Sequence, residues 1–373
     1  NREFSWLEFN RRVLSESLDP RTPLLERLKF LGIFSSNLDE YFMVRVAVLK
    51  KQIEAEVHKL TPDGRTPQEQ LDGINQILLP MVYLQHQFFE ETLRPELGKN
   101  GIYLLNYIDL NKEQKTYLKN YFEEQIFPVL TPLAIDSSHP FPYLSNLSLN
   151  LAVILKNPDT QEDLLARIKV PKILPRFLCL PEKLQIEEKV KTINWTGVPL
   201  EQVIAHNLGT LFPGMDIQEY HLFRVTRDAD LGVQEDESDD LLLVIEKELR
   251  KRRIGGTVVR MEINPTMPSK LKRMLMENLE LSEKDVYTVD GLLDLKDLMS
   301  FLGLPFPNLK DPTWTSTMPP RLRHYGDDIR TADLNNNDRI DFFEVIRQKD
   351  LLVHHPYHSF ASTVQDFISQ AAQ

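Results

Sequence analysis

Prolines crowd one short stretch of the chain. Proline lacks the backbone N–H that helices and central strands use, so a stretch this dense in proline forms neither. The residues concerned are Pro305, Pro307, Pro312, Pro319 and Pro320. We therefore expect residues 305–325 to be a linker. The chain has 373 residues, 42% of them hydrophobic, which is enough to bury separate cores on the two sides of this linker.

Before the linker, residues 1–105 carry apolar side chains at helical spacing. Three stripes follow the i, i+3, i+4 and i+7 pattern of one helix face. Their members are Trp6, Phe9 and Val13; Leu24, Leu28 and Leu31; and Leu38, Phe42, Val46 and Leu49. A further helix is predicted through Val82, Phe88 and Phe89. Helices with one apolar face must pack on each other, so this segment is predicted to form a helical bundle.

Residues 106–304 combine the apolar spacing of strands with that of helices. Strand-like patterns are followed by helical ones, which is typical of a sheet with helices packed against it. The predicted strands are Leu147–Leu155, Leu222–Thr226 and Val258–Ile263. The predicted helices are Leu241–Leu249, one that begins at Ser269 after Pro268, and one through Leu292, Leu295 and Leu298. This segment is predicted to be an α+β domain.

Residues 326–373 begin with a loop rich in Asn and Asp. A short helix at Phe342–Gln348, a strand at Leu351–His354 and a final helix at Phe360–Ala372 are predicted to follow. The chain starts at Asn1 and stops directly after a helical pattern, so we expect this third domain to be incomplete and the chain to be part of a longer protein. The predicted fold class is multidomain, α and α+β.

The charge and the cysteine content indicate which cellular compartment and which binding partners to expect. With 44 Lys and Arg against 55 Asp and Glu, the formal charge is −11, which argues against a protein that coats nucleic acid. The one cysteine, Cys179, cannot form an internal disulfide, so a cytoplasmic location is favoured. No stretch reaches the roughly 20 apolar residues that a spanning helix requires. Any membrane association would therefore be peripheral.

Several common catalytic signatures are absent from the sequence. There is no GxxxxGK(S/T) phosphate loop and no GxGxxG turn. There is also no CxxC, HExxH or GxSxG. Metal-dependent hydrolysis and serine-ester chemistry are thus unsupported. If the protein binds ATP, it does so without either of these glycine-rich motifs.

Two polar segments each allow a structural and a functional interpretation. Asn37 is a good N-cap, and Glu40 three residues later completes a capping box. A capping amide can still face a cleft, so a ligand role for Asn37 stays open. The basic run Lys247–Arg253 either complements the carboxyl end of a helix or forms an edge that attracts a polyanion.

The loop after the linker has the spacing of a calcium loop. The matching side chains are Asp333, Asn335, Asn337, Asp341 and Glu344. However, Asp338 stands where the sharp turn requires glycine, and a turn that caps the next helix is the competing interpretation. Further on, His354 and His355 are adjacent on a predicted strand and would point to opposite faces, so at most one can enter a given site.

Segments spread along nearly the whole chain resemble polyphosphate kinases of the ATP-using, phosphohistidine type. They occur in the family's order. The segments are Asn1–Asn10, Arg12–Leu14, Arg27–Leu31, Ser36–Glu40, Phe127–Pro132, His139–Pro142, Ser145–Asn150, Phe223–Asp230, His354–Tyr357 and Ser359–Phe360. The resemblance implies a helical N-terminal domain (1–105), an α+β head domain (106–304) and, at 326–373, the start of a first catalytic domain of the phospholipase D type.

The resemblance also implies an activity. Such kinases move the terminal phosphate of ATP to a histidine and then to polyphosphate, with magnesium neutralising charge. We therefore expect ATP or ADP and inorganic polyphosphate as substrates, a dimer or tetramer, no nucleic acid partner, and a cytoplasmic location or one at the inner face of the membrane. The phosphorylated histidine is expected downstream of Gln373, so His354 and His355 are not the acceptors and this chain alone is expected to be inactive. Asn37 aligns with an asparagine that contacts the nucleotide and is the expected ATP-binding residue.

Two other classes of function stay open. The chain could serve as a noncatalytic module that binds nucleotide or dimerises. It could also respond to calcium through Asp333–Glu344. Dimerisation without nucleotide binding would indicate the first class, and a melting temperature that depends on calcium would indicate the second.

Overall fold

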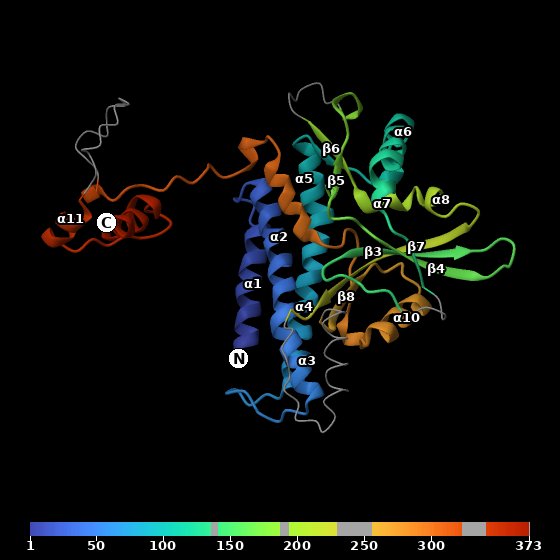
Figure 1. Ribbon diagram of the computed structural model, residues 1–373, viewed down its shortest axis with the longest axis horizontal. Coiled ribbons are helices and arrows are strands. Elements are labelled where there is room, and N and C mark those ends of the chain that lie inside the picture. Colours follow the sequence, from blue (N-terminus) through green and yellow to red (C-terminus); the bar gives the residue numbers. More distant parts are fainter. Residues whose placement is uncertain (136–140, 187–193, 230–255, 323–340, 373) are drawn as a thin grey trace. The chain divides into compact units, whose positions relative to one another are not determined.

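The structure is a computed structural model that forms two compact units, Asn1–Lys310 and Asp311–Gln373. The ranges that it describes are 1–135, 141–186, 194–229, 256–322 and 341–372. The first unit holds both the helices and the sheets that position the candidate site (Figure 1).

Long helices lead the first unit. They are α1 (Arg2–Leu18), α2 (Leu24–Tyr41), a π-helical turn (Phe42–Val46), α3 (Ala47–Glu54), α4 (Pro67–Phe88), a second π-helical turn (Phe89–Leu93), α5 (Arg94–Lys99) and α6 (Lys112–Tyr121). Phe42 and Ala47 keep right-handed helical dihedrals, so α2, the first π turn and α3 form one continuous helix. At the start of α4, Thr66 and Glu69 exchange hydrogen bonds in a capping box.

The predicted helix start at Asn37 is wrong. Asn37 lies inside α2, which begins directly after Pro23. The buried residues Leu31, Phe34 and Leu38 continue the helical spacing through the polar segment. Tertiary packing of this apolar face stabilises the helix more than a local cap would, because helices in proteins depend mostly on such packing.

The buried face of α1 also differs from the predicted stripe. Leu7, Asn10 and Leu14 are buried, whereas Phe9 is 47% exposed and Trp6 is only partly buried. The core side of α1 therefore lies one position away from the stripe that the sequence suggested. Trp6 and Phe9 are left to line a surface pocket instead.

Two sheets complete the first unit. A six-stranded sheet has the order β2-β4-β3-β7-β8-β9, antiparallel except for the parallel pair β8–β9, and a smaller sheet has the order β1-β6-β5. The strands are β1 (Ile102–Leu104), β2 (Leu133–Ile135), β3 (Leu149–Lys156), β4 (Asp163–Lys169), β5 (Phe177–Cys179), β6 (Trp195–Pro199), β7 (Asp216–Arg227), β8 (Val258–Ile263) and β9 (Val286–Thr288). The three predicted strands are thus confirmed as β3, β7 and β8.

Two further segments were predicted to be helices. The one after Pro268 is confirmed as α10 (Ser269–Leu279). The pattern through Leu292, Leu295 and Leu298 forms a 3₁₀ helix, η8 (Leu295–Gly303), rather than an α-helix. Two short helices, α7 (Leu200–Ala205) and α8 (Leu208–Leu211), follow β6.

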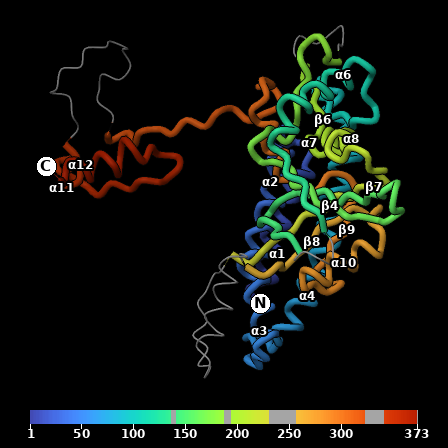
Figure 2. The backbone as a smooth tube through the Cα atoms, turned by 45° about the vertical axis from the view of Figure 1, so that its right-hand side comes forward, coloured from blue at the N-terminus to red at the C-terminus, as the bar shows by residue number. Residues whose placement is uncertain are grey.

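The two faces of the six-stranded sheet pack against different elements. On one face, Leu151 and Val153 of β3 join the same core as α1, α2 and α4. On the other face, Ala152 belongs to a second core that contains Leu271 and Leu275 of α10. Figure 2 shows α10 beside β8 and β9 from a second direction. Helices α1, α2 and α4 therefore share one core with the six-stranded sheet, and α10 packs in a second core on its other face.

The second unit is built from short elements. They are a 3₁₀ turn (Pro320–Leu322), α11 (Phe342–Gln348), a π-helical turn (Ala361–Gln365) and α12 (Asp366–Ala371). The predicted strand Leu351–His354 is wrong. Instead, the chain turns back on itself, with the His358 N–H donating to the His354 carbonyl at 2.8 Å, so no ladder forms along these residues.

Some predicted features lie outside the described residues and stay predictions. They are the helix Leu241–Leu249, the basic run Lys247–Arg253, and the loop residues Asp333, Asn335 and Asn337.

Candidate functional site

The structure places Asn37 in a pair of linked side-chain amides. Asn37 Nδ2 donates to Asn10 Oδ1 at 2.9 Å, across the interface between α2 and α1. Asn10, which is fully buried, in turn donates from its own Nδ2 to the Phe34 carbonyl at 3.3 Å. We call this arrangement the amide relay. It joins a partly exposed side chain to a fixed point on the helix backbone.

The amide relay decides which atoms Asn37 presents to solvent. The Phe34 carbonyl can only accept, so Asn10 must turn its N–H group toward it and its oxygen toward Asn37. Asn37 must then use Nδ2 for the bond to Asn10. Its Oδ1 and the remaining N–H have no partner among the described residues. A ligand beside Asn37 would therefore meet one acceptor and one donor in a defined orientation.

These atoms face a small pocket of about 240 Å³ at the surface of the helices. The lining residues are Arg2, Trp6, Phe9, Asn37, Glu40, Tyr41, Val44 and Arg45. Trp6 stacks on Tyr41 with ring centroids 4.2 Å apart and an angle of 12° between the planes. Complete small-molecule sites are usually larger, roughly 300–1,000 Å³. The pocket therefore suits a flat apolar portion of a ligand rather than a whole one.

Three charged side chains line the pocket, namely Arg2, Glu40 and Arg45. Arg45 is paired with Glu3, with Nε 3.1 Å from Oε2. Burial, followed by the nearby charge of Glu3, raises the pKa of Tyr41, so its hydroxyl is neutral. Arg2 makes no ion pair among the described residues and is the cation at the rim that a ligand could engage. The pocket thus combines an aromatic wall, an oriented amide and one available positive charge.

A buried charge cluster lies about 200° around α2 from Asn37, at Asp39. Two Arg224 nitrogens contact the Asp39 carboxylate at 2.9 and 2.5 Å, and Arg224 Nη1 also donates to Glu262 at 2.6 Å. Arg260 binds the same carboxylate. Burial alone would raise the pKa of Asp39, but the charges of Arg224 and Arg260 outweigh it and hold this pKa below its ordinary value. The cluster fastens α2 to strands β7 and β8.

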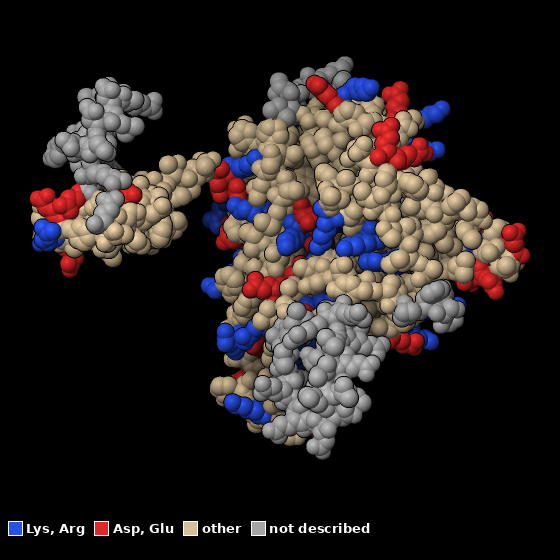
Figure 3. Space-filling view, in the orientation of Figure 1, with Lys and Arg blue, Asp and Glu red and all other residues tan. Residues whose placement is uncertain are grey.

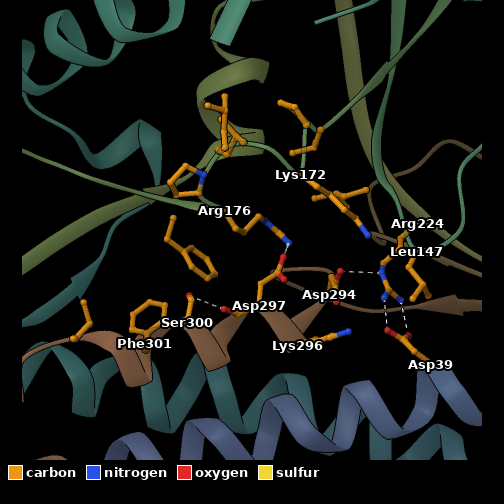
Figure 4. Close-up of a pocket in the computed structure, with 18 of the residues that line it drawn as sticks. Asp39, Leu147, Lys172, Arg176, Arg224, Asp294, Lys296, Asp297, Ser300 and Phe301 are labelled. Atoms are coloured by element: carbon orange, nitrogen blue, oxygen red, sulfur yellow. Dashed lines mark hydrogen bonds and ion pairs between the residues drawn. The ribbon is translucent and has the colours of Figure 1, made fainter. Parts of the chain in front are cut away.

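A second and larger cavity, of about 480 Å³, adjoins this cluster (Figure 4). Arg176 lies at its wall and is fully engaged, with Glu201 2.6 Å away and Asp297 2.9 Å away. Asp294 reaches Arg224 Nε at 3.2 Å. Burial first, and then the charges of Asp297 and Asp39, raise the pKa of Asp294 above its ordinary value despite the nearby arginines.

The described residues provide no metal centre. Among them, no group of three His, Cys, Asp or Glu side chains is arranged to hold a metal ion. Asp341 Oδ1 accepts from the Glu344 backbone N–H at 3.1 Å and caps α11, which is the competing interpretation that the sequence offered for this loop. The His355 ring forms a hydrogen bond with the His358 carbonyl at 2.9 Å and thus stabilises the turn that it belongs to.

The first unit is a helical bundle that shares its core with an α+β sheet domain, and its N-terminal helices carry an aromatic pocket with one oriented amide. These features define a multidomain protein of α and α+β architecture. The chain belongs to the polyphosphate kinase family. Sequence models of this family match in succession, with the N-terminal domain at residues 1–105, the middle domain at 113–301 and C-terminal domain 1 at 341–373.

Individual relatives agree with the family models. The polyphosphate kinase of Synechocystis sp. is 60% identical over all of this chain and 51% of its own length. That of Thermosynechococcus vestitus is 51% identical, and that of Mycobacterium tuberculosis is 44% identical, again over all of this chain. These matches cover 52% and 49% of those relatives. The chain therefore spans about half the length of these relatives.

A solved structure supports the same fold. The crystal structure of polyphosphate kinase from Porphyromonas gingivalis superimposes with a TM-score of 0.75 at 26% sequence identity. It covers all of this chain, which corresponds to 49% of that protein. Within the residues that the structure describes, no helix has both the length and the apolar content for crossing a membrane.

The sequence indicated Asn37 but not its surroundings. Asn10 left only a weak local signal, because the buried face of α1 that it shares with Leu7 and Leu14 also carries the polar residues Glu3 and Ser17. The residues of the second cavity left none, since Asp39, Arg224 and Asp294 come from widely separated segments.

Proposed function

We propose that this chain is the N-terminal and middle part of an enzyme that transfers the terminal phosphate of ATP reversibly to inorganic polyphosphate through a phosphohistidine. The succession of three polyphosphate kinase domains along the chain supports this proposal. The observation that carries the role of this chain within the enzyme is the oriented amide of Asn37 in an aromatic pocket.

In this proposal the pocket receives the adenine ring. Asn37 Oδ1 accepts from the 6-amino group and the remaining Nδ2 proton donates to a ring nitrogen, since asparagine pairs with adenine in this two-bond manner. Trp6 and Phe9 offer apolar surface to the flat base. Arg2 at the rim offers a positive charge to the phosphates.

Phosphate transfer itself is assigned to residues downstream of Gln373. Such a transfer depends on positioned cations around the phosphates, and magnesium supplies part of that charge when bound with ATP. Around the Asn37 pocket the described residues offer a single carboxylate, Glu40, that is not committed to an arginine. These residues do not fit a magnesium site.

The exposed apolar side chains of the sheet support self-association as a dimer or tetramer. Leu164 of β4 and Ile217 of β7 flank Leu155 of β3 in register, so the two side chains occupy the same face of the sheet. Both are more than one-third exposed. A noncatalytic dimerisation module would use the same face, so this feature does not decide between the two functions. We place the enzyme in the cytoplasm or at the inner face of the membrane.

A chimaera tests the proposed function. Joining residues 1–373 to the corresponding second half of the Synechocystis polyphosphate kinase should give an enzyme that forms polyphosphate from ATP. The same chimaera with Asn37→Asp should show a half-saturation concentration for ATP that is raised by about tenfold, the effect of one or two lost hydrogen bonds. Asn278→Asp, at an exposed position of α10, is the matched control and should leave the kinetics unchanged. A chimaera that melts cooperatively yet forms no polyphosphate would overturn the proposal.

A further inference from the structure

The cavity in Figure 4 has two chemically different ends. One wall is apolar and includes Phe177, Trp195 and Phe301. The other end is charged and includes Asp294 and the arginines of the buried cluster. At about 480 Å³ the cavity lies within the range of roughly 300–1,000 Å³ that small-molecule sites occupy. It is separate from the Asn37 pocket, with which it shares no lining residue.

Two cations at the charged end have side chains without a partner in the part of the chain that the structure describes. Lys172, in the loop between β4 and β5, and Lys296, at the start of η8, both line the cavity and are exposed. Neither makes a hydrogen bond or ion pair with any described residue, in contrast to Arg176 and Arg224. In Figure 4 the two amines reach the end of the cavity where the Asp294 carboxyl group lies. Lys and Arg side chains gather in this region, between the helices and the sheet, in the space-filling view (Figure 3).

The Asp294 carboxyl group is the second, independent indication of a ligand. Its side chain is 90% buried, and Oδ1 makes no hydrogen bond. Arg224 Nε, 3.2 Å from Asp294 Oδ2, also lacks a directed hydrogen bond. Buried polar atoms without partners are rare in native proteins, because desolvating them costs free energy. Burial raises the pKa of Asp294 above its ordinary value, so its negative charge is held less firmly than that of an exposed aspartate.

We propose that this cavity binds a small organic anion with an apolar or aromatic body. The acidic group, a phosphate, sulfonate or carboxylate, pairs with Lys172 and Lys296 at the charged end of the cavity. The body of the ligand packs against Trp195 and Phe301 at the apolar wall. This site is independent of the proposed adenine pocket and of phosphate transfer.

The position of the cavity suggests what such a ligand would act on. Asp39 belongs both to the cavity wall and to α2, two residues beyond Asn37. A ligand there would touch the contact between α2 and the sheet without entering the Asn37 pocket.

Calorimetric titration of the 373-residue chain with 1-naphthalenesulfonate tests the site, because this probe combines an aromatic body with a permanent negative charge. We expect saturable binding that is at least about tenfold tighter than the binding of methanesulfonate or of naphthalene methanol. Each of these comparison probes lacks one half of the proposed recognition, and one charge-assisted contact corresponds to about this factor. Equal binding of the sulfonate and the uncharged alcohol would overturn the proposal.

Variants localise the binding. Lys172→Ala together with Lys296→Ala should weaken 1-naphthalenesulfonate binding by at least about tenfold. The control pair Lys183→Ala and Lys270→Ala, also exposed lysines, should not change it. Asp294→Asn keeps the size of the side chain and removes a potential negative charge, so binding should be retained or strengthened. An unchanged affinity in the first pair, or an equal loss in the control pair, would refute the site.

Discussion

The amide relay should allow Asn37 to distinguish adenine from hypoxanthine. Adenine presents a 6-amino donor, whereas hypoxanthine presents a 6-oxo acceptor. With Asn10 holding Asn37 in one orientation, Oδ1 meets the donor of adenine favourably and the acceptor of hypoxanthine unfavourably. Asn10 is thus proposed as a positioning residue that never touches the base.

Replacement of Asn10 by leucine tests this role. Asn10→Leu extends the buried apolar face of Leu7 and Leu14, so we expect the free energy of unfolding to change little. Asn37 would be free to turn its amide over. The preference of the chimaera for ATP over ITP, measured as a ratio of kcat/KM values, should fall by about threefold to tenfold, the worth of one hydrogen bond. A preserved ratio would show that Asn37 needs no support from Asn10.

A second residue links stability to pH. His86 of α4 is buried, and burial lowers its pKa from 6.5 to about 4, in opposition to the nearby charges of Glu262 and Asp290. Between these pH values the unfolded chain binds a proton that the folded chain does not bind. Folding therefore loses stability as the pH falls below 6.5, by about 1.4 kcal/mol per pH unit, until about pH 4.

His86→Gln should remove this part of the acid sensitivity. Urea unfolding at pH 7.5 and pH 5.5 should show a loss for the wild-type chain that exceeds the loss for His86→Gln by about 1 kcal/mol. His58→Gln, at an exposed position, is the control and should behave as the wild type. An identical loss in the wild type and His86→Gln would mean that His86 has the same pKa in the folded and the unfolded chain.

At the scale of elements, the proposed role of β4 and β7 in self-association can be tested. Leu164 of β4 and Ile217 of β7 both flank Leu155 of β3, and each keeps more than one-third of its surface exposed. Leu164→Lys should shift the chain toward monomer in sedimentation at micromolar concentration, because an apolar contact is exchanged for a charge. Ile173→Lys, at a position that is 81% exposed, should leave the association unchanged. A monomeric wild-type chain would contradict a role of this face within residues 1–373.

The elements that could be predicted are those with a complete local signal. Val258–Ile263 follows two glycines and is recovered without error as β8, and the proline before Ser269 marks the start of α10. The helix start at Asn37 was predicted wrongly, because the burial of Phe34 and Leu38 continues α2 through the local capping pattern. The cavity could not be predicted, since nothing local connects Lys172 with Lys296.

At the scale of the whole molecule, the chain is expected to lack phosphate transfer on its own. In the proposed mechanism the phosphorylated histidine lies downstream of Gln373. Incubation of the 373-residue chain with labelled ATP and magnesium should leave it without acid-labile, base-stable phosphate. The active chimaera under the same conditions is the positive control. Stoichiometric labelling of the chain would instead direct attention to His354 and His355.

The buried charge cluster limits how the two sequence domains can be recombined during evolution. Asp39 and Arg224 lie 185 residues apart, on the two sides of the sequence boundary near residue 105. Recombination at that boundary could replace the segment on one side with a segment that lacks the charged residue. The remaining charged side chain, Asp39 or Arg224, would then be buried without its partner, at a cost of about 3–5 kcal/mol. Such a recombinant would lose much of the stability of a typical domain. We therefore expect the helices and the sheet to be passed on together as one evolutionary block.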